Sequence, residues 1–297
     1  WVAQAEYCGY YQAVATDIYK EYGLDVTVKP GGPRMNVGLL LMIGGTDLAL
    51  GDGTEALKAV ESTVPKVTVA SIFQKAPRVL ISHPNVGINS LEDLRGKPIL
   101  TSSSAGATYW PFLKEKYGYT DDQQQPYQFD VEPFLNDPNL SQQGLLTSEP
   151  FEISQRGQFE PVVMLLADEG YDPYSFTIET TSSLVETNPD LVQRFVDASI
   201  KGWYSYLEDP SPGNALIKRD NPDMSDALLS YSLKSMKDYG IIVSGDAEEL
   251  GIGAMTDERW QQHFQDMVGS ELINPNTDYK KAYTLQFINK GKRYYAG

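Results

Sequence analysis

The feature that most constrains the fold is a regular alternation of helical and extended patterns over the first hundred residues, with glycine or proline at each change. Apolar residues between 6 and 22 recur at three-and-four spacing, which predicts a helix that stops at Gly23. The alternating segment 24–28 predicts a strand, 36–43 a second helix, and 47–50 a short buried strand. This order favours parallel βαβ units and therefore an α/β fold.

A second block of the same kind follows, and the chain then returns to the first. We predict strands at 66–72, 78–82, 98–101 and 175–185, a polar surface loop at 120–130, and helices at 189–207, 223–239 and 256–267. One block is thus inserted in the other. We expect two lobes, residues 1–80 with 176–297 and residues 81–175, with a ligand cleft and hinge strands between them.

The charge balance excludes some classes of partner. Forty acidic against twenty-four basic side chains give a net charge of −16, which disfavours nucleic-acid binding. The best apolar run, 38–43, is cut short by Gly44 and Gly45, which predicts a soluble chain. The sequence opens at Trp1 without Met or a signal-like segment, so we expect a mature or trimmed product, which fits export. The periplasmic location that we expect comes from the resemblance described below.

Cysteine and histidine are scarce. Cys8 stands alone, which excludes an internal disulfide framework and multi-cysteine metal motifs. His83 and His263 lie in unrelated contexts, and we predict that both are solvated surface imidazoles. No nucleophile has a base beside it in the sequence, so we expect a protein that is not an enzyme and uses no metal and no cofactor.

Aromatic and polar side chains gather at the start of the chain, where we predict the first strand-to-helix junction. Flat rings offer stacking area, and amides and carboxylates orient a polar ligand by its edge. The candidate ligand residues in this stretch are Trp1, Gln4, Glu6, Tyr10 and Tyr11. The alternative is that the helix-spaced Tyr7 and Tyr11 belong to the core.

Other predicted strand ends carry polar tips, which adds candidates for the same site. They are Asp52, Gln74, Ser102, Ser103, Ser104, Glu149 and Tyr174. The three serines precede a predicted helix and form either a cradle for an anion or carbonyl or an ordinary helix cap. A carboxylate at Glu149 suits an amine or amidine-like ligand edge, because it accepts two parallel hydrogen bonds.

Several of these stretches together resemble a known family. They include Trp1-x-x-Gln4-x-Glu6-x-x-Gly9-Tyr10-Tyr11, Tyr22-Gly23-Leu24-Asp25-Val26, Pro30-Gly31-Gly32-Pro33, Leu91-x-Asp93-Leu94-x-Gly96-Lys97 and Thr147-Ser148-Glu149-Pro150. The chain is similar to periplasmic substrate-binding proteins of ABC importers. It looks closest to the branch that binds thiamine pyrimidine precursors, with nitrate, sulfonate and taurine binders as cousins.

The resemblance implies a two-lobed, type II Venus-flytrap fold with a central mixed sheet in each lobe. It implies a non-catalytic, monomeric receptor that delivers a hydroxymethyl- or aminomethyl-pyrimidine to a membrane permease. Trp1 and Tyr10 match the aromatic sandwich of such binders, and Glu149 matches the glutamate that pairs with the aminopyrimidine. The alternatives are a sulfonate, taurine or nitrate binder, and a pyrimidine-synthesising enzyme with lysine-bound pyridoxal, whose cysteine cluster this chain lacks.

Overall fold

The computed structural model describes residues 1–32 and 35–295. The chain forms two compact units: unit 1 is Trp1–Lys75, Pro173–Asp266 and Ile273–Gly297, and unit 2 is Ala76–Asp172 and Met267–Leu272. The predicted boundaries at 80/81 and 175/176 fall inside strands β3 (Arg78–Ser82) and β8 (Ser175–Thr181). The chain instead changes unit between strands, and Met267–Leu272 groups with unit 2 rather than with the first lobe.

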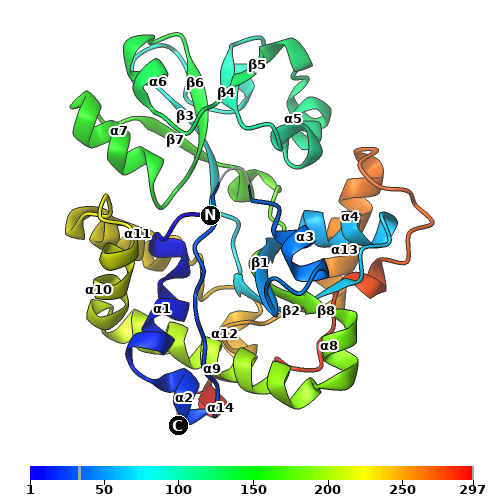
Figure 1. Cartoon of the computed structure of the whole chain (residues 1–297). Coiled ribbons are helices and arrows are strands. Elements are labelled where there is room, and N and C mark those ends of the chain that lie inside the picture. The colour runs from blue at the N-terminus through cyan, green and yellow to red at the C-terminus, as the bar shows by residue number, and fades with distance from the viewer. Residues whose placement is uncertain (33–34, 296–297) are drawn as a thin grey trace. The chain divides into compact units, whose positions relative to one another are not determined.

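Unit 1 is built on a sheet in which β8 lies between β1 (Leu48–Asp52) and β2 (Lys66–Phe73), antiparallel to both (Figure 1). β1 and β2 therefore run in the same direction and are joined by helix α4 (Gly53–Glu61), as the alternation predicts. They are not neighbours, however, because β8 separates them. A parallel bridge between Thr68 and Tyr283 adds a second orientation to this sheet.

The start of the chain differs from the prediction. The expected helix at 6–22 is wrong as a single element, because Asp17 adopts a left-handed backbone with φ of 58° and breaks it. The pieces are η1 (Ala5–Tyr7), α1 (Cys8–Ala15) and α2 (Ile18–Glu21). The expected strand at 24–28 is also wrong, since these residues alternate in pattern but pair with no strand of residues 1–32 and 35–295. The helix expected at 36–43 is α3 (Val37–Met42), with the Asn36 side chain accepting from the Leu39 amide.

The remaining helices of unit 1 belong mainly to the last third of the chain. They are α8 (Ser182–Thr187), α9 (Pro189–Glu208), α10 (Ser211–Asp220), α11 (Asp226–Asp238), α12 (Ala247–Leu250), α13 (Asp257–Gly269), which ends in unit 2, η6 (Tyr279–Ala282) and α14 (Lys292–Tyr295). The predicted start of α9 is confirmed: Asn188 Oδ1 accepts from the Leu191 amide at 3.2 Å, and Pro189 follows.

Helices α1 and α9 pack unusually closely through two glycines. A Cβ at Gly9 would lie 2.2 Å from the Trp203 ring, and one at Gly202 would lie 2.4 Å from the carbonyl oxygen of Gly9. Trp203 is fully buried and meets Tyr10 edge-on, with ring centroids 6.1 Å apart. The missing side chains therefore let the indole lie directly on the backbone of α1.

A buried ion pair crosses the sheet of unit 1. Lys66 Nζ lies 2.7 Å from Glu179 Oε2, with side-chain exposures of 10% and 4%. Burial raises the pKa of Glu179, and the attraction of Lys66 opposes that shift. The Glu179 carboxylate occupies the space beside Gly51, where a Cβ would lie 2.2 Å from it. Glycine at 51 thus makes room for the charge that ties β8 to β2.

Unit 2 contains a five-stranded sheet of mixed orientation in the order β5-β4-β6-β3-β7. β4 (Ile99–Thr101) is parallel to β5 (Gln124–Pro126) and β6 (Ser141–Leu145), whereas β3 is antiparallel to β6 and to β7 (Val162–Leu165). Its helices are η2 (Glu92–Leu94), η3 (Ala105–Ala107), α5 (Trp110–Tyr117), η4 (Asp121–Gln123), α6 (Glu132–Asn136), α7 (Glu149–Gly157) and η5 (Leu166–Glu169). The predicted loop at 120–130 is wrong, because η4 and β5 lie in it.

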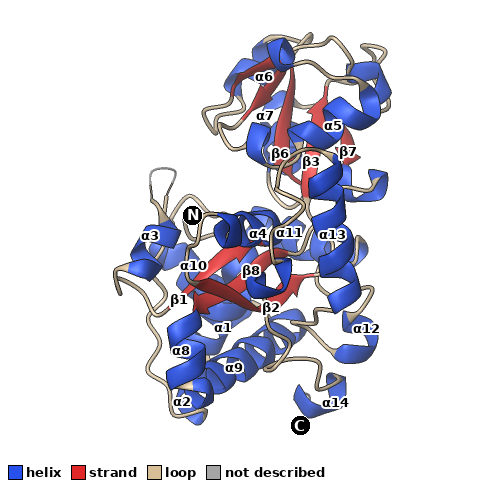
Figure 2. Ribbon diagram, turned by 90° about the vertical axis from the view of Figure 1, so that its right-hand side faces the viewer, coloured by secondary structure: helices blue, strands red, loops and turns tan. Residues whose placement is uncertain are grey.

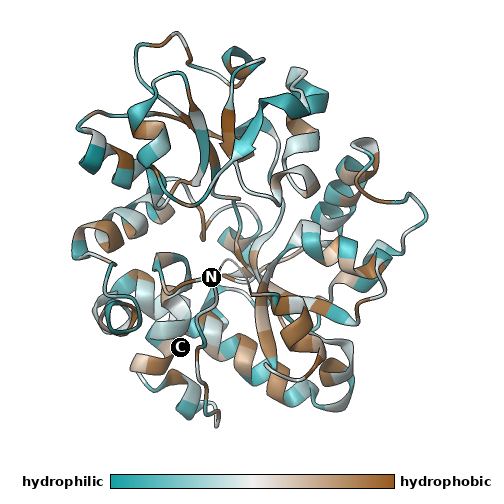
Figure 3. Cartoon of the chain, turned by 45° about the horizontal axis from the view of Figure 1, so that its top comes forward, coloured by the Kyte–Doolittle hydropathy of each residue, from teal (hydrophilic) through white to brown (hydrophobic). Residues whose placement is uncertain are grey.

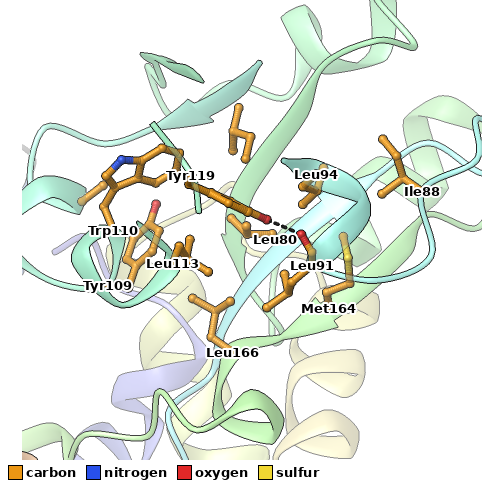
Figure 4. Packing of buried hydrophobic residues seen from close by; sticks show 12 residues of the cluster. Leu80, Ile88, Leu91, Leu94, Tyr109, Trp110, Leu113, Tyr119, Met164 and Leu166 are labelled. Carbon is orange, nitrogen blue, oxygen red and sulfur yellow. Dashed lines mark hydrogen bonds between the residues drawn. The ribbon is translucent and has the colours of Figure 1, made fainter. Parts of the chain in front are cut away.

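The core of unit 2 gathers one face of β3 and the helix that follows β4. Leu80, Tyr109, Trp110, Leu113 and Tyr119 pack together, and the Tyr119 hydroxyl donates to the Leu91 carbonyl at 2.7 Å (Figure 4). Each unit brings several helices to its sheet (Figure 2), and hydrophobic and hydrophilic segments both occur in the strands (Figure 3). Within the described residues, no helix combines the length and apolar content needed to span a membrane.

The α1–α9 contact predicts a strong response to one methyl group. Gly9→Ala places a Cβ inside the Trp203 ring, so we expect a loss of about 1–3 kcal/mol of unfolding free energy, seen as a Tm lowered by several degrees. Gly269→Ala is the matched control, because no atom lies within 4 Å of its Cβ position. Equal Tm values for the two variants would contradict the close packing described above.

Candidate functional site

Three predicted site residues meet at one edge of the unit 1 sheet. Ser175, at the start of β8, pairs with Asp52 at the end of β1 and with Phe73 at the end of β2. Gln74 follows Phe73, and Tyr174 precedes Ser175. Asp52, Gln74 and Tyr174, far apart in sequence, are therefore neighbours here. We call this group the strand-end cluster.

Tyr174 makes several contacts in the strand-end cluster. Its hydroxyl accepts from the Thr256 amide at 2.9 Å and donates to Asp246 Oδ2 at 3.2 Å. The Arg259 guanidinium carbon lies 4.3 Å from the centre of its ring, a cation–π arrangement. Burial raises the pKa of Tyr174 to about 12, although Arg259 lowers it, so the hydroxyl stays protonated at neutral pH.

Gln74 offers a buried acceptor. Its Nε2 donates to the carbonyls of Ser71 and Ala254, both at 2.9 Å, and its own carbonyl accepts from Arg259 Nη2 at 2.6 Å. Within the described part of the chain, Gln74 Oε1 is buried without a hydrogen-bond partner. An acceptor of this kind fits an N–H donor, because an unpaired buried oxygen costs free energy.

Asp52 is engaged as a helix cap. Its Oδ1 accepts from the Thr54 amide at 2.8 Å, at the first turn of α4. The Thr54 hydroxyl lies 3.0 Å from His263 Nε2. Burial, with a smaller effect from Arg259, lowers the pKa of His263 to about 4, so the imidazole is neutral at pH 7.

The prediction of two solvated imidazoles is wrong. His83 is 7% exposed, and its Nε2 lies 2.7 Å from the Phe134 carbonyl. His263 is only partly exposed and bonded to Thr54. His83 directly follows β3, and His263 lies in α13. Their partners, Phe134 and Thr54, are far away in sequence, so the local pattern does not predict these contacts.

Aromatic rings connect the start of the chain to the strand-end cluster. Tyr7 lies 5.7 Å from Phe176 and Phe176 lies 4.3 Å from Phe73, measured between ring centroids. Phe176 follows Ser175 in β8, so η1 reaches the same edge of the sheet. Trp1 and Gln4 in this stretch are partly exposed, whereas Glu6 is buried at 1% exposure. The described chain has no strand before α1, so the predicted strand-to-helix junction is wrong in form.

Tyr10 and Tyr11 lie inside unit 1 with exposures of 4% and 3%. Neither hydroxyl has a hydrogen-bond partner among the described residues. The alternative considered for Tyr11, a core position, agrees with this burial. A stacking role for Tyr10 stays a prediction, since in this structure its ring packs edge-on against Trp203.

Unit 2 has its own polar edge. β4 and β6 are parallel neighbours, so Ser102–Ser104, after β4, and Glu149, after β6, lie at the same edge of that sheet. The Ser102 amide and the Tyr109 hydroxyl both donate to Gln143 Oε1 at 2.7 Å. The helix expected after the serines is the three-residue turn η3, which offers little of a helix dipole.

One carboxylate oxygen of Glu149 accepts hydrogen bonds next to the start of its own helix, α7. Its Oε2 accepts from the Leu145 amide at 2.8 Å and from the Ser148 hydroxyl, whereas Oε1 has only a long contact of 3.4 Å to the Tyr127 hydroxyl. One carboxylate oxygen therefore holds the first turn of α7 against β6. The other retains accepting capacity for a ligand donor.

The residues that complete these edges have no clear signal in the sequence. Arg259, Thr256 and Asp246 belong to the C-terminal helices and their loops, and Arg78 opens β3 with its guanidinium carbon 5.8 Å from the Tyr109 ring centre. Arg259, Thr256 and Asp246 reach the strand-end cluster through contacts between segments that are far apart in sequence. Among these four residues, only the position of Arg78 follows from the local sequence, because it comes directly after Pro77 at the start of a predicted strand. In the described residues, His, Cys, Asp and Glu form no group of three or more placed to hold a metal ion.

The two units and their polar strand ends indicate a class of protein without reference to any relative. An α/β unit formed by two distant stretches, with a second α/β unit inserted and polar groups gathered at strand ends, is typical of periplasmic binding proteins. The structure of the aliphatic sulphonate binding protein SsuA of Escherichia coli matches with a TM-score of 0.71 and 14% identity, over 94% of this chain and 89% of that one. The desulfurization enzyme DSZB matches with a TM-score of 0.60 and 14% identity, over 96% and 94%. These likenesses establish the periplasmic-binding-protein fold.

The chain belongs to the NMT1/THI5-like family, whose model matches residues 4–212. A relative in Chloroflexus aurantiacus, the riboflavin-binding protein RibY, is 23% identical over 98% of this chain and 85% of its own length. The resemblance to the substrate-binding superfamily of ABC importers is therefore confirmed. At the coarse level these findings support a solute-binding protein of ABC-type import.

The lowered pKa of His263 predicts a pH-dependent stability. The folded state holds the ring neutral down to about pH 4, whereas an unfolded histidine takes up a proton near 6.5. Stability from this group is thus present above pH 6.5 and falls as the pH drops towards 4, by at most about 3 kcal/mol. His263→Gln should lose this slope, as measured by urea unfolding between pH 7 and pH 4. A slope equal to that of the wild type would show that His263 is not its source.

Proposed function

We propose that the protein is an extracytoplasmic solute receptor of an ABC importer for a planar heterocycle with a pyrimidine-type edge. One observation carries the proposal: Asp52, Gln74 and Tyr174 converge beside the Tyr7, Phe73 and Phe176 rings in a chain that aligns over 98% of its length with a riboflavin-binding relative. Thiamine pyrimidine precursors and the isoalloxazine of riboflavin both contain a pyrimidine-type ring whose edge carries hydrogen-bond donors and acceptors, although in different order.

The described side chains supply both kinds of contact that such a ligand needs. Trp1 is partly exposed and is our candidate for stacking on the heterocycle. In unit 1, Gln74 Oε1 is an acceptor for a ring N–H or amino group. In unit 2, considered by itself, the less engaged oxygen of Glu149 is our second candidate acceptor. The thiamine precursors, with an exocyclic amine, make the fuller use of a carboxylate acceptor.

An anion is the second candidate. Arg259 brings a positive charge to the strand-end cluster, and SsuA, which shares the fold, is a sulphonate binder by its title. Against this, Arg259 already donates to the Gln74 carbonyl and stacks on Tyr174, and Asp52 and Asp246 lie in the same cluster. The heterocycle is therefore the better fit.

A binding role also agrees with the state of the only thiol. Cys8 is fully buried, its Sγ contacts Asn214 Oδ1 at 3.6 Å, and burial raises the pKa of Cys8 to about 12. A protonated, enclosed thiol is a poor nucleophile. We propose a monomer that passes its ligand to a membrane permease without changing it chemically.

A thermal-shift panel tests the ligand class. We expect a pyrimidine-edged heterocycle, either hydroxymethylpyrimidine or riboflavin, to raise the Tm at micromolar to millimolar concentration, because a ligand stabilises the state that it binds. Taurine and nitrate should leave the Tm unchanged. A shift with the anions and with neither heterocycle would replace the heterocycle by the second candidate.

Two substitutions test the proposed contacts. Trp1→Ala should remove a stacking surface and Glu149→Gln a charged acceptor, each weakening the heterocycle that scores in the panel by about tenfold in calorimetric titration. The controls are Tyr239→Ala, an exposed ring, and Glu92→Gln, an exposed carboxylate. Unchanged affinity in both test variants, with binding otherwise intact, would mean that these residues do not contact the ligand.

A further inference from the structure

The loop after β5 in unit 2 presents an aromatic ring to the solvent. Phe129 is 47% exposed, and its ring centroid lies 5.2 Å from that of the buried Tyr127. Among the described residues of unit 2, Val86 is the one other large apolar side chain that is more than a third exposed. Single exposed rings are common on protein surfaces, so exposure alone does not mark a site.

The backbone of Phe129 is strained as well. Its φ of 60° lies in the left-handed region, where the Cβ of an L-residue comes too close to the following carbonyl oxygen. Glycine and asparagine adopt this conformation readily, whereas a bulky aromatic residue is an outlier there. Strain of this kind gathers at ligand-binding positions, where it holds a side chain in one place. Phe129 therefore combines two unfavourable features, exposure and strain, that an asparagine at this position would avoid.

The chain is fixed on both sides of Phe129, which explains why the strain is not released. On one side, the Tyr127 amide donates to the Thr101 carbonyl at 2.9 Å, which extends the pairing between β5 and β4. On the other side, Asp130 Oδ1 accepts from the Glu132 amide at 3.0 Å, at the start of α6. One residue separates Phe129 from Tyr127 and none separates it from Asp130. The surrounding structure therefore holds Phe129 in the left-handed region.

Phe129 lies at the polar edge of unit 2. β5 is parallel to β4, so the residues after β5 lie at the same end of this sheet as Ser102–Ser104, which follow β4. Tyr127 connects Phe129 to the carboxylate at this edge, because its ring packs against Phe129 and its hydroxyl contacts Glu149 Oε1 at 3.4 Å. An exposed flat ring and a carboxylate oxygen that can accept a further hydrogen bond are thus joined through one tyrosine.

The surroundings of the Phe129 ring fit a small molecule better than a protein partner. Its neighbours in sequence, Gln128 and Asp130, are polar and exposed. Val86 follows the end of β3 that pairs with the start of β6, so it lies at the opposite end of the sheet. A stable protein interface buries about 800 Å² of each partner, far more than one ring offers. A planar small molecule needs only one ring to cover one of its faces.

We propose that Phe129 is a ligand-binding residue of unit 2: the planar ring of the solute stacks on its exposed face, while Glu149 Oε1 accepts from the amino or N–H edge of the same solute. This inference rests on the proposed function and names the ring that unit 2 contributes to it. The solute covers the apolar surface that Phe129 exposes, which is favourable. The strained backbone keeps the ring in place before the ligand arrives, so little conformational freedom is lost on binding.

Three variants of the full chain separate stacking from a structural role. Phe129→Asn removes the ring and suits the left-handed backbone, so we expect the Tm of the ligand-free protein to stay within about 2 °C of the wild type or to rise. In calorimetric titration, it should bind the heterocycle that scores in the panel, hydroxymethylpyrimidine or riboflavin, about tenfold more weakly. Phe129→Tyr, the matched control, keeps a flat ring and should bind within about twofold of the wild type. Phe129→Leu keeps apolar bulk without a flat ring and should lose about fivefold.

The outcomes distinguish this inference from the proposed function. If the wild type binds a heterocycle and Phe129→Asn binds it equally well, the stacking role is refuted and the proposed function stands. Wild-type affinity in Phe129→Leu would refute stacking in the same way. A fall of about 5 °C or more in the Tm of ligand-free Phe129→Asn would show that the ring stabilises the fold, and would overturn the inference. If neither heterocycle shifts the Tm of the wild type, the proposed function fails and this inference fails with it.

Discussion

The position of β8 between β1 and β2 is the constraint on which the rest of unit 1 depends. Without it, Asp52 and Gln74 would end two strands that no ladder joins, and Tyr174 would lie on an unrelated stretch. Ser175 pairs with both Asp52 and Phe73. Asp52, Gln74 and Tyr174 therefore lie close together at one end of this sheet. The buried Lys66–Glu179 pair then fixes β8 against β2, because separating a buried charge from its partner is costly.

Much of the fold follows from patterns that are local. The spacing of apolar residues, the Asn188 cap and the glycines at helix ends identify α3, α9 and the direction of β1 relative to β2. Two predictions made from local patterns are wrong, each for its own reason. Asp17 takes a left-handed conformation that hydrophobic spacing does not register, and residues 24–28 have strand character without a neighbour to pair with. A strand is a property of two segments, so one alternating segment is not enough.

The candidate site could be predicted in part, because polar residues at predicted strand ends of an α/β protein are candidates for a binding site. Asp52, Gln74 and Tyr174 were found in this way. Arg259, Thr256 and Asp246 were not, because their helices carry no pattern that links them to those strands. The burial of His83 and His263 was missed for the same reason: a neutral imidazole in a packed place has no signature along the chain.

The insertion of β8 also has a consequence for the order in which the molecule forms. β1 and β2 emerge from the ribosome early, but the strand that joins them comes more than a hundred residues later. Most of unit 2 is one continuous stretch, Ala76–Asp172, that is complete before β8 is made. Long-range pairing is slow because a large loop must close first. During synthesis, the sheet of unit 1 is therefore completed after that of unit 2. β1 and β2 cannot pair with β8 until Thr181, the last residue of β8, has been added.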